Sequence, residues 1–424
     1  MKKFIAMILA VLFVCGALAA CGEADKKDDD ATTATDATAA PAVDADFKVG
    51  VVLVGDENEG YTFAHMEGIK EAAKSLGLAD SQIIWKYNIP EDEQCKDACD
   101  DLVGQGCSVI FTNSYGHQSY TLQAAEEYPE VQFVAMTGDT AKASGLDNFC
   151  NAFTRVYESR FVSGVVAGMK VQELIDADKI PAEGKDADGN IKIGYVGAFP
   201  YAEVVSGYTA FYLGIKSIVP NVVMDVQYTN SWFDMVAEGA AADALMARGC
   251  VIIGQHADST GAPSAVQAAL ESGKVAYSVG YNVDMLSVAP DAALTSATNN
   301  WSVYYTYAIG TALKGEKIDT NWAEGYEKDA VAITELGASC ADGTAEKVAE
   351  VIAAIKDGSL HVFAQDSFTV GGETVETAYA TDTDGDWTPD ADNAMFDGYY
   401  HESYFQSAPA FGLRIDGITE LNNN

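Results

Sequence analysis

A regular alternation of strand-like and helix-like segments runs from residue 47 to residue 314 and constrains the fold most. Apolar runs of a few residues, such as 48–54, alternate with longer segments of helical periodicity, such as 64–76, where Ile69 and Ala73 lie on one face. Strand–helix alternation of this kind predicts parallel sheets with helices on both faces. We therefore expect an α/β protein.

The predicted strands are too numerous for one sheet of ordinary width, so we expect two doubly wound lobes joined by a hinge. The expected division is a first lobe of residues 47–153 and 290–317 and a second lobe of residues 154–289. In this scheme the strand at 293–297 returns to the first lobe. Residues 318–424 carry weaker periodicity, and we expect them to form a C-terminal segment that packs on the lobes.

The N-terminus has the pattern of a bacterial lipoprotein leader. Lys2 and Lys3 precede an apolar stretch at 4–17, and "LAAC" ends at Cys21. We expect residues 1–20 to be a signal peptide and Cys21 to carry the lipid anchor, with residues 21–46 forming a disordered acidic tether. This places the protein on the extracytoplasmic face of a cell membrane. The alternative is an ordinary signal peptide followed by a chance cysteine.

The charge balance and the missing motifs exclude several functions. A formal net charge of -38 over 424 residues argues against nucleic-acid binding. The sequence has no G-x-S-x-G elbow, Walker loop or H-E-x-x-H motif. The acidic turn with Asp382, Asp384 and Asp386 has the wrong spacing for an EF-hand. We expect no enzyme activity, no cofactor and no metal site, and we expect the six cysteines after Cys21 to be mostly free, buried thiols.

The candidate ligand site comes from the loops that follow the predicted strands, since open α/β sheets bind ligands at the carboxyl ends of their strands. Nearly every such loop combines an aromatic side chain with a polar one, as a site for a flat, hydrogen-bonding molecule requires. The candidate ligand-binding residues are Tyr61, Phe63, Asn113, Tyr115, Phe199, Trp232, Asp234, Gln255, His256, Asp258, Asn282, Asn300 and Trp301.

Each of these residues also has a structural alternative. Tyr61 and Phe63 could pack the first helix on its sheet, and His256 could be an ordinary buried histidine. Asp234 and Asp258 each precede a predicted helix and could cap it. We favour ligand binding for the whole set, because an aromatic side chain beside a polar one follows nearly every predicted strand.

Several of these stretches in this order resemble the basic membrane protein family of lipoproteins, which includes purine-nucleoside receptors of ABC importers. They are "VGVVLV", "GYTFAHMEGIKEAA", "FTNSYGH", "FTRVYESRFVSGVVAGM", "IGYVGAFPYAEVVSGYTAFYLGIKS" and "QHADSTGAP". The resemblance implies a type I periplasmic-binding-protein fold and delivery of a ligand to a membrane permease. It also implies that a purine stacks between aromatics of both lobes, with Asp258 at the base edge or the sugar.

Two departures from the family pattern concern the ribose. Nucleoside-binding members carry aspartate where this chain has Asn282, and a lysine where it reads Asn299-Asn300-Trp301. A free purine base and a nucleoside therefore both remain as ligands. We expect a monomeric, lipid-anchored receptor of an ABC importer for one of them. The alternatives are a binding protein for riboflavin or a sugar, or a sensory module.

Overall fold

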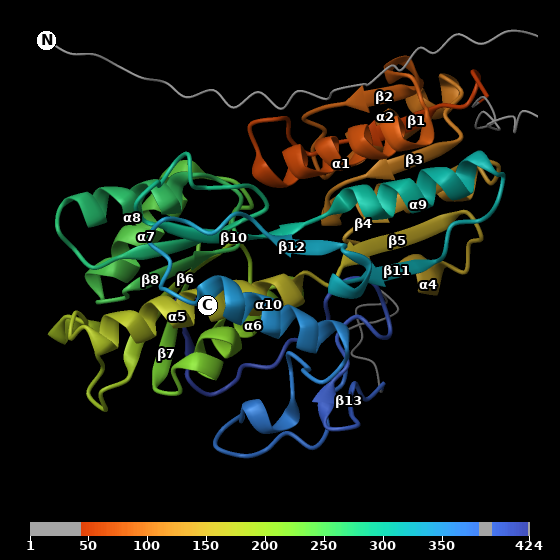
Figure 1. Ribbon diagram of the computed structural model, residues 1–424. Helices are drawn as coiled ribbons and strands as arrows, with labels where there is room; N and C mark the ends of the chain where they lie inside the picture. The colour runs from red at the N-terminus through yellow and green to blue at the C-terminus, as the bar shows by residue number, and fades with distance from the viewer. Residues whose placement is uncertain (1–43, 381–391, 423–424) are drawn as a thin grey trace, which may run out of the picture. The chain divides into compact units, whose positions relative to one another are not determined.

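The computed structural model describes residues 44–380 and 392–422 and contains two mainly parallel sheets (Figure 1). The predicted signal peptide, the lipidation site Cys21, nearly all of the predicted tether and the acidic turn at Asp382 lie outside the described residues. None of the described helices is long and apolar enough to cross a membrane.

The first sheet is entirely parallel and has the strand order β11-β5-β4-β3-β1-β2. We call this sheet and its helices the first lobe. Its strands are β1 (Val49–Val52), β2 (Ile83–Lys86), β3 (Val109–Thr112), β4 (Gln132–Met136), β5 (Phe149–Thr154) and β11 (Asn321–Glu324).

Helices cover both faces of the first sheet, as its two-sided apolar strands require. On one face, α1 (Gly60–Leu76) lies beside α9 (Trp301–Leu313), and their apolar sides share a core with the strands (Figure 1). On the other face lie α2 (Glu93–Gly104), α3 (Gln118–Glu127) and the short α4 (Ala141–Ser144).

The second sheet, with its helices, forms the second lobe and has the strand order β12-β10-β9-β8-β6-β7-β15. Only β12 runs antiparallel to its neighbour. The strands are β6 (Ile191–Gly197), β7 (Val222–Tyr228), β8 (Ile252–Gln255), β9 (Tyr277–Tyr281), β10 (Ala293–Asn299), β12 (Val331–Ile333) and β15 (Ile418–Glu420).

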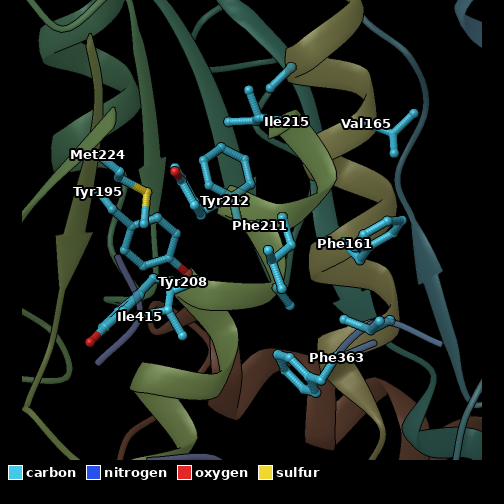
Figure 2. Packing of buried hydrophobic residues seen from close by; sticks show 14 of the residues in the cluster. Phe161, Val165, Tyr195, Tyr208, Phe211, Tyr212, Ile215, Met224, Phe363 and Ile415 are labelled. Carbon is cyan, nitrogen blue, oxygen red and sulfur yellow. The ribbon is translucent and has the colours of Figure 1, made fainter. Parts of the chain in front are cut away.

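One face of the second sheet is covered by two tightly packed helices, α5 (Val156–Asp176) and α6 (Ala202–Ile218) (Figure 2). Their contact depends on glycine. A Cβ on Gly164 would lie 2.2 Å from the Phe211 carbonyl oxygen, and one on Gly214 would lie 2.1 Å from the Phe161 carbonyl oxygen. The opposite face carries α7 (Met235–Ala247) and α8 (Gly261–Glu271).

The expectation that the strand at 293–297 returns to the first lobe is wrong. This strand, β10, pairs in parallel with β9 of the second sheet. The chain leaves the second lobe only after β10, when α9 packs beside α1. Helical and strand periodicity are local properties, so they do not specify which sheet a strand joins.

The C-terminal segment adds strands to both sheets as well as packing on them. It supplies β11 to the first sheet, and β12 and β15 to the second. The chain thus passes between the lobes three times, after β5, β10 and β11. At these passages Arg155 N donates to Glu324 O (2.8 Å), Asn300 N donates to Ala330 O (2.8 Å), and Thr154 Oγ1 donates to Asn299 Oδ1 (2.5 Å).

The rest of the C-terminal segment contains α10 (Thr344–Lys356) and a hairpin of β13 (Met395–Phe396) and β14 (Tyr399–Tyr400). Phe363 and Ile415 enter the core of the second lobe (Figure 2). Phe411 joins them, and its ring stacks on that of Phe363 with the centroids 4.3 Å apart. Short 3-10 turns lie at Asp80–Gln82, Tyr115–His117, Ala182–Gly184, Tyr326–Lys328 and Gln365–Ser367. The six cysteines in the described part of the chain are free, and all but Cys340 are buried.

Candidate functional site

A cavity of about 1050 Å³ opens among the loops at the carboxyl ends of the strands of both lobes. Every strand from β1 to β9 contributes to its wall, either directly or through the loop that follows it, which is where parallel α/β sheets bind ligands. The aromatic, amide and acidic residues of the wall are Asp56, Asn58, Glu59, Tyr61, Asn88, Asn113, Tyr115, Asp139, Phe153, Phe199, Tyr201, Glu203, Asn230, Trp232, Phe233, Asp258, Tyr281 and Gln406. His256 also lines the cavity.

Three aromatic side chains of the second lobe form one wall. The rings of Phe199 and Tyr201 are stacked with their centroids 5.2 Å apart, and Trp232 meets Phe199 edge-to-face at 5.1 Å. All three come from the loops after β6 and β7, so the two strand ends place them together. Each ring retains exposed surface, which gives a flat ligand a face to stack on.

The facing wall in the first lobe carries two tyrosines with fixed hydroxyl groups. Tyr61 donates to Asn113 O (2.8 Å), and Tyr115 donates to Asp139 Oδ2 (2.9 Å). The Tyr115 ring also lies 6.1 Å from that of Tyr201, so aromatic side chains of the two lobes come close at the cavity. These contacts hold the rings in place before any ligand arrives.

A buried carboxylate, Asp258, lies at the end of β8. Its Oδ1 accepts a hydrogen bond from Asn282 Nδ2 (2.6 Å), and Asn282 Oδ1 accepts one from Asn299 Nδ2 (3.0 Å). Burial raises the pKa of Asp258 well above its usual value, and the nearby carboxylates of Glu59 and Glu238 add to the shift. Asp258 therefore keeps its proton over a wider pH range than an exposed aspartate.

His256 is neutral and oriented by two partners. Burial lowers its pKa, although the neighbouring Glu203 carboxylate opposes the shift. In the neutral ring Nε2–H donates to Glu203 (2.7 Å to Oε2), and Nδ1 lies 3.3 Å from the Tyr195 hydroxyl, which donates to it. Both ring nitrogens are thus engaged within the protein, and His256 holds Glu203 at the cavity wall.

The cavity is strongly acidic. Asp56, Glu59, Asp139, Glu203 and Asp258 line it, and among the described lining residues none is a lysine or an arginine. Burial raises the pKa of Glu59, whose carboxylate accepts a hydrogen bond from Thr62. A site of this kind suits a neutral or cationic ligand that offers hydrogen-bond donors.

A family model described as "ABC transporter substrate-binding protein PnrA-like" matches residues 47–360. The chain belongs to this family. The match confirms the resemblance inferred from the loop sequences, and the members of this PnrA-like family are binding proteins rather than enzymes.

Individual relatives agree with this assignment. A purine-binding protein of Brucella abortus (strain 2308) is 31% identical over 74% of the chain and 83% of its own length. A Haloferax volcanii protein named "Putative ABC transporter glucose-binding protein TsgA13" is 30% identical over 61% of the chain and 60% of its own length. A solute-binding protein of an Aeropyrum pernix ABC transporter superposes with a TM-score of 0.60 at 16% identity, over 77% of this chain and 94% of its own. This structural likeness confirms the predicted type I periplasmic-binding fold.

Seven of the thirteen predicted site residues line the cavity of this PnrA-like protein, and they come from both lobes. They are Tyr61, Asn113, Tyr115, Phe199, Trp232, His256 and Asp258. The side chain of Asn113 is already engaged, since it accepts from Val54 N and donates to Thr62. Asp258 does not cap α8, whose first turn is served by Ser259 Oγ.

Three predicted residues hold loops or helix ends instead of lining the cavity. Asp234 caps α7 by accepting from the backbone N–H groups of Val236 and Ala237. Gln255 donates to two carbonyl groups of its own loop. Asn300 donates to Asp329 O at a passage between the lobes.

The other three lie beside or behind the wall. Phe63 is 38% exposed on α1 and does not line the cavity. Trp301 is buried behind Tyr61, with its ring stacked on His65 at 4.3 Å. Asn282 stands behind Asp258 and orients its carboxylate.

Several residues that line the cavity were not predicted from the sequence. Glu59 directly precedes the stretch "GYTFAHMEGIKEAA", and Tyr201 and Glu203 lie within "IGYVGAFPYAEVVSGYTAFYLGIKS", so their position after a strand was a usable signal. Gln406, Ala408 and Pro409 gave no such signal, because they belong to a segment without strand–helix periodicity.

Proposed function

We propose that this protein is the lipid-anchored receptor of an ABC importer and that it binds a purine base or purine nucleoside in the cavity between its lobes. The observation that carries the proposal is the pairing of a three-ring aromatic wall with one oriented, buried carboxyl group. Phe199, Tyr201 and Trp232 supply the rings, and Asp258 supplies the carboxyl group.

This pairing fits the chemistry of a purine. Base–aromatic stacking contributes about 1–3 kcal/mol per base in proteins that bind nucleic acids. A protonated carboxyl group can donate one hydrogen bond and accept another, as can the edge of a purine, which carries ring nitrogens beside an exocyclic group. The raised pKa of Asp258 favours that protonated form.

A relative supports the same ligand class. The Brucella abortus protein that matches most of the chain is named as purine-binding. A sugar is the second candidate, because the Haloferax volcanii relative is named for glucose binding and an acidic, aromatic cavity also accommodates a sugar ring. The two ligand classes are distinguished directly by binding.

Membrane anchoring rests on the sequence of the leader. Small residues precede Cys21, which is the arrangement that lipoprotein processing requires. The test is the variant Cys21→Ser expressed as the full chain. We expect the wild type in the membrane fraction with an acyl-sized mass increase on its N-terminal peptide. We expect the variant to lack that increase and to leave the membrane fraction.

Isothermal titration of the protein against adenine, guanine, hypoxanthine, their nucleosides, D-glucose and riboflavin tests the ligand. We expect dissociation constants in the micromolar range or lower for at least one purine and no heat from glucose or riboflavin. Tight binding of glucose or riboflavin without binding of any purine would contradict the assignment and leave only the receptor fold.

A further inference from the structure

The C-terminal segment forms part of the cavity wall through Gln406, Ala408 and Pro409. These residues lie beyond residue 360, where the match to the PnrA-like family ends. The region common to the family therefore does not supply this part of the wall. Any contacts that this part of the wall makes with a ligand come from the C-terminal segment alone.

Residues 402–411 form a strap that is fixed to both lobes. Glu402 Oε2 accepts hydrogen bonds from Ala410 N (3.2 Å) and Phe411 N (2.8 Å), which closes the strap into a loop. Phe411 is buried in the second lobe, and Ser407 N donates to Asn321 Oδ1 of β11 in the first lobe (3.3 Å). The strap is thus held between its two attachments at the cavity.

Gln406 occupies the part of the strap that reaches the cavity. Its side chain is only 4% exposed, and Oε1 has no hydrogen-bond partner among the residues that the structure describes. A buried amide oxygen without a partner is unfavourable, and such groups need an explanation in a native structure. A ligand that donates a hydrogen bond to this amide supplies one.

We propose that Gln406 is a specificity-determining residue that hydrogen-bonds a polar group of the bound ligand, while Ala408 and Pro409 form the apolar wall beside it. The inference rests on the proposed function, since the ligand class comes from there. It goes further by assigning ligand selection to a segment outside the family region. The strap then discriminates among purines that share the same stacking surface but differ in their ring substituents.

The test compares four full-length proteins by isothermal titration: wild type, Gln406→Ala, Gln406→Glu and Gln123→Ala. Gln123 is an exposed glutamine on α3 that does not line the cavity, so it serves as the matched control. The probes are adenine, guanine, hypoxanthine, their nucleosides, D-glucose and riboflavin. Circular dichroism and thermal midpoints establish that each variant is folded.

We expect Gln406→Ala to weaken the best wild-type purine at least fivefold and to change the order of affinities among the three bases. We expect Gln406→Glu, which loses the amide donor, to shift that order differently, and Gln123→Ala to stay within twofold of wild type. Equal affinities for wild type and Gln406→Ala across the panel overturn the inference. So does a uniform loss that accompanies a lower thermal midpoint, since that is a structural effect.

The two proposals fail in different ways. If the wild type binds glucose or riboflavin and no purine, the purine assignment is wrong. The role of Gln406 is then decided on that compound. At least fivefold weaker binding by folded Gln406→Ala supports it, and unchanged binding overturns it.

Discussion

Asn282 Nδ2 donates a 2.6 Å hydrogen bond to Asp258 Oδ1, with both side chains buried. Nucleoside-binding relatives, by the resemblance in the sequence, carry aspartate at the position of Asn282. Two carboxylates at this distance would repel each other, so the asparagine here is matched to Asp258. Asn282 supplies Asp258 with a hydrogen-bond donor that an ionised aspartate at this position would lack.

This relationship predicts the effects of two substitutions. Asp258→Ala removes the carboxyl group, and with it one donor and one acceptor, from the cavity. We expect roughly tenfold weaker purine binding, because each neutral hydrogen bond contributes about 0.5–1.5 kcal/mol. Asn282→Asp leaves Asp258 without its donor, and we expect affinity to rise as the pH falls and the pair binds a proton. Titrations at pH 5, 6, 7 and 8 measure both effects. Binding by Asp258→Ala equal to that of wild type would place the ligand elsewhere.

The aromatic wall predicts a loss of affinity when one of its rings is removed. We expect Trp232→Ala to weaken purine binding by about 1–3 kcal/mol, which is roughly five- to 150-fold, because it removes a ring from the stacking surface. Phe63→Ala is the matched control, since Phe63 is a partly exposed aromatic residue that does not line the cavity. Isothermal titration measures both affinities. Equal losses of purine affinity in the two variants would contradict a role of the aromatic wall in ligand binding.

Buried carboxyl groups predict that the protein is more stable at mildly acidic pH. Burial raises the pKa of Glu238 and of Glu402 to about 7, from 4.5. Between these values the folded state holds protons that the unfolded state releases, so the unfolding free energy falls as the pH rises from about 5 to 7. Each such group contributes up to about 1.4 kcal/mol per pH unit in that window.

Urea unfolding at pH 5, 6, 7 and 8 measures this slope. We expect Glu402→Gln to flatten it, because the variant carries no titratable group at that buried position. Glu346→Gln, a change on the exposed surface of α10, should leave the slope as it is in the wild type. An unfolding free energy that rises from pH 5 to pH 7 would show that other groups dominate the titration.

The close contact between α5 and α6 predicts that one added methyl group at Gly164 lowers the unfolding free energy. Gly164→Ala places a carbon 2.2 Å from the Phe211 carbonyl oxygen, which backbone movement must relieve. We expect a loss of about 1–3 kcal/mol of unfolding free energy. Gly104→Ala on α2 meets no atom within 4 Å and should be neutral or stabilising by up to about 1 kcal/mol. Denaturant midpoints of the two variants give the comparison.

The contacts of Glu420 predict that this residue helps to hold strand β15 on the second sheet. It accepts hydrogen bonds from Tyr208 (2.8 Å) and Tyr228 (2.5 Å), and Arg414 forms an ion pair with it at 3.0 Å. We expect Glu420→Ala to lower the unfolding free energy by about 1–3 kcal/mol, because polar groups in the interior lose their partner. Thr419→Ala, on the exposed side of the same strand, should change it little. Faster proteolysis near residue 420 in the first variant alone would support this role.

Much of the fold was predictable because the α/β rhythm is a local signal. The predicted strand at 48–54 contains β1, and the predicted helix at 64–76 lies within α1 and ends at the same residue, Leu76. The sheet that β10 joins was mispredicted because periodicity carries no pairing information, although pairing with the preceding strand β9 follows the tendency of consecutive strands to be neighbours.

The site was predictable to the level of loops but not of side chains. Placing ligand residues after strands found Asp258 and Trp232, which line the cavity. The same reasoning selected Gln255 and Trp301, whose side chains turn into their own loop and into the core. Local hydrogen bonds determine which way these side chains point. Neither the residue type nor its position after a strand specifies that direction. Gln406 lies too far along the chain for any local pattern to connect it with the cavity.

The position of β15 has a consequence for how the protein is made. Its partner β7 ends at Tyr228, and β15 begins only at Ile418. During synthesis the outer edge of β7 therefore remains an unpaired strand edge while about half of the chain is still missing, and such edges invite pairing with other chains. Nascent chains stalled before residue 418 should accordingly aggregate more readily than complete ones, which makes the last strand a safeguard for solubility as well as a structural element.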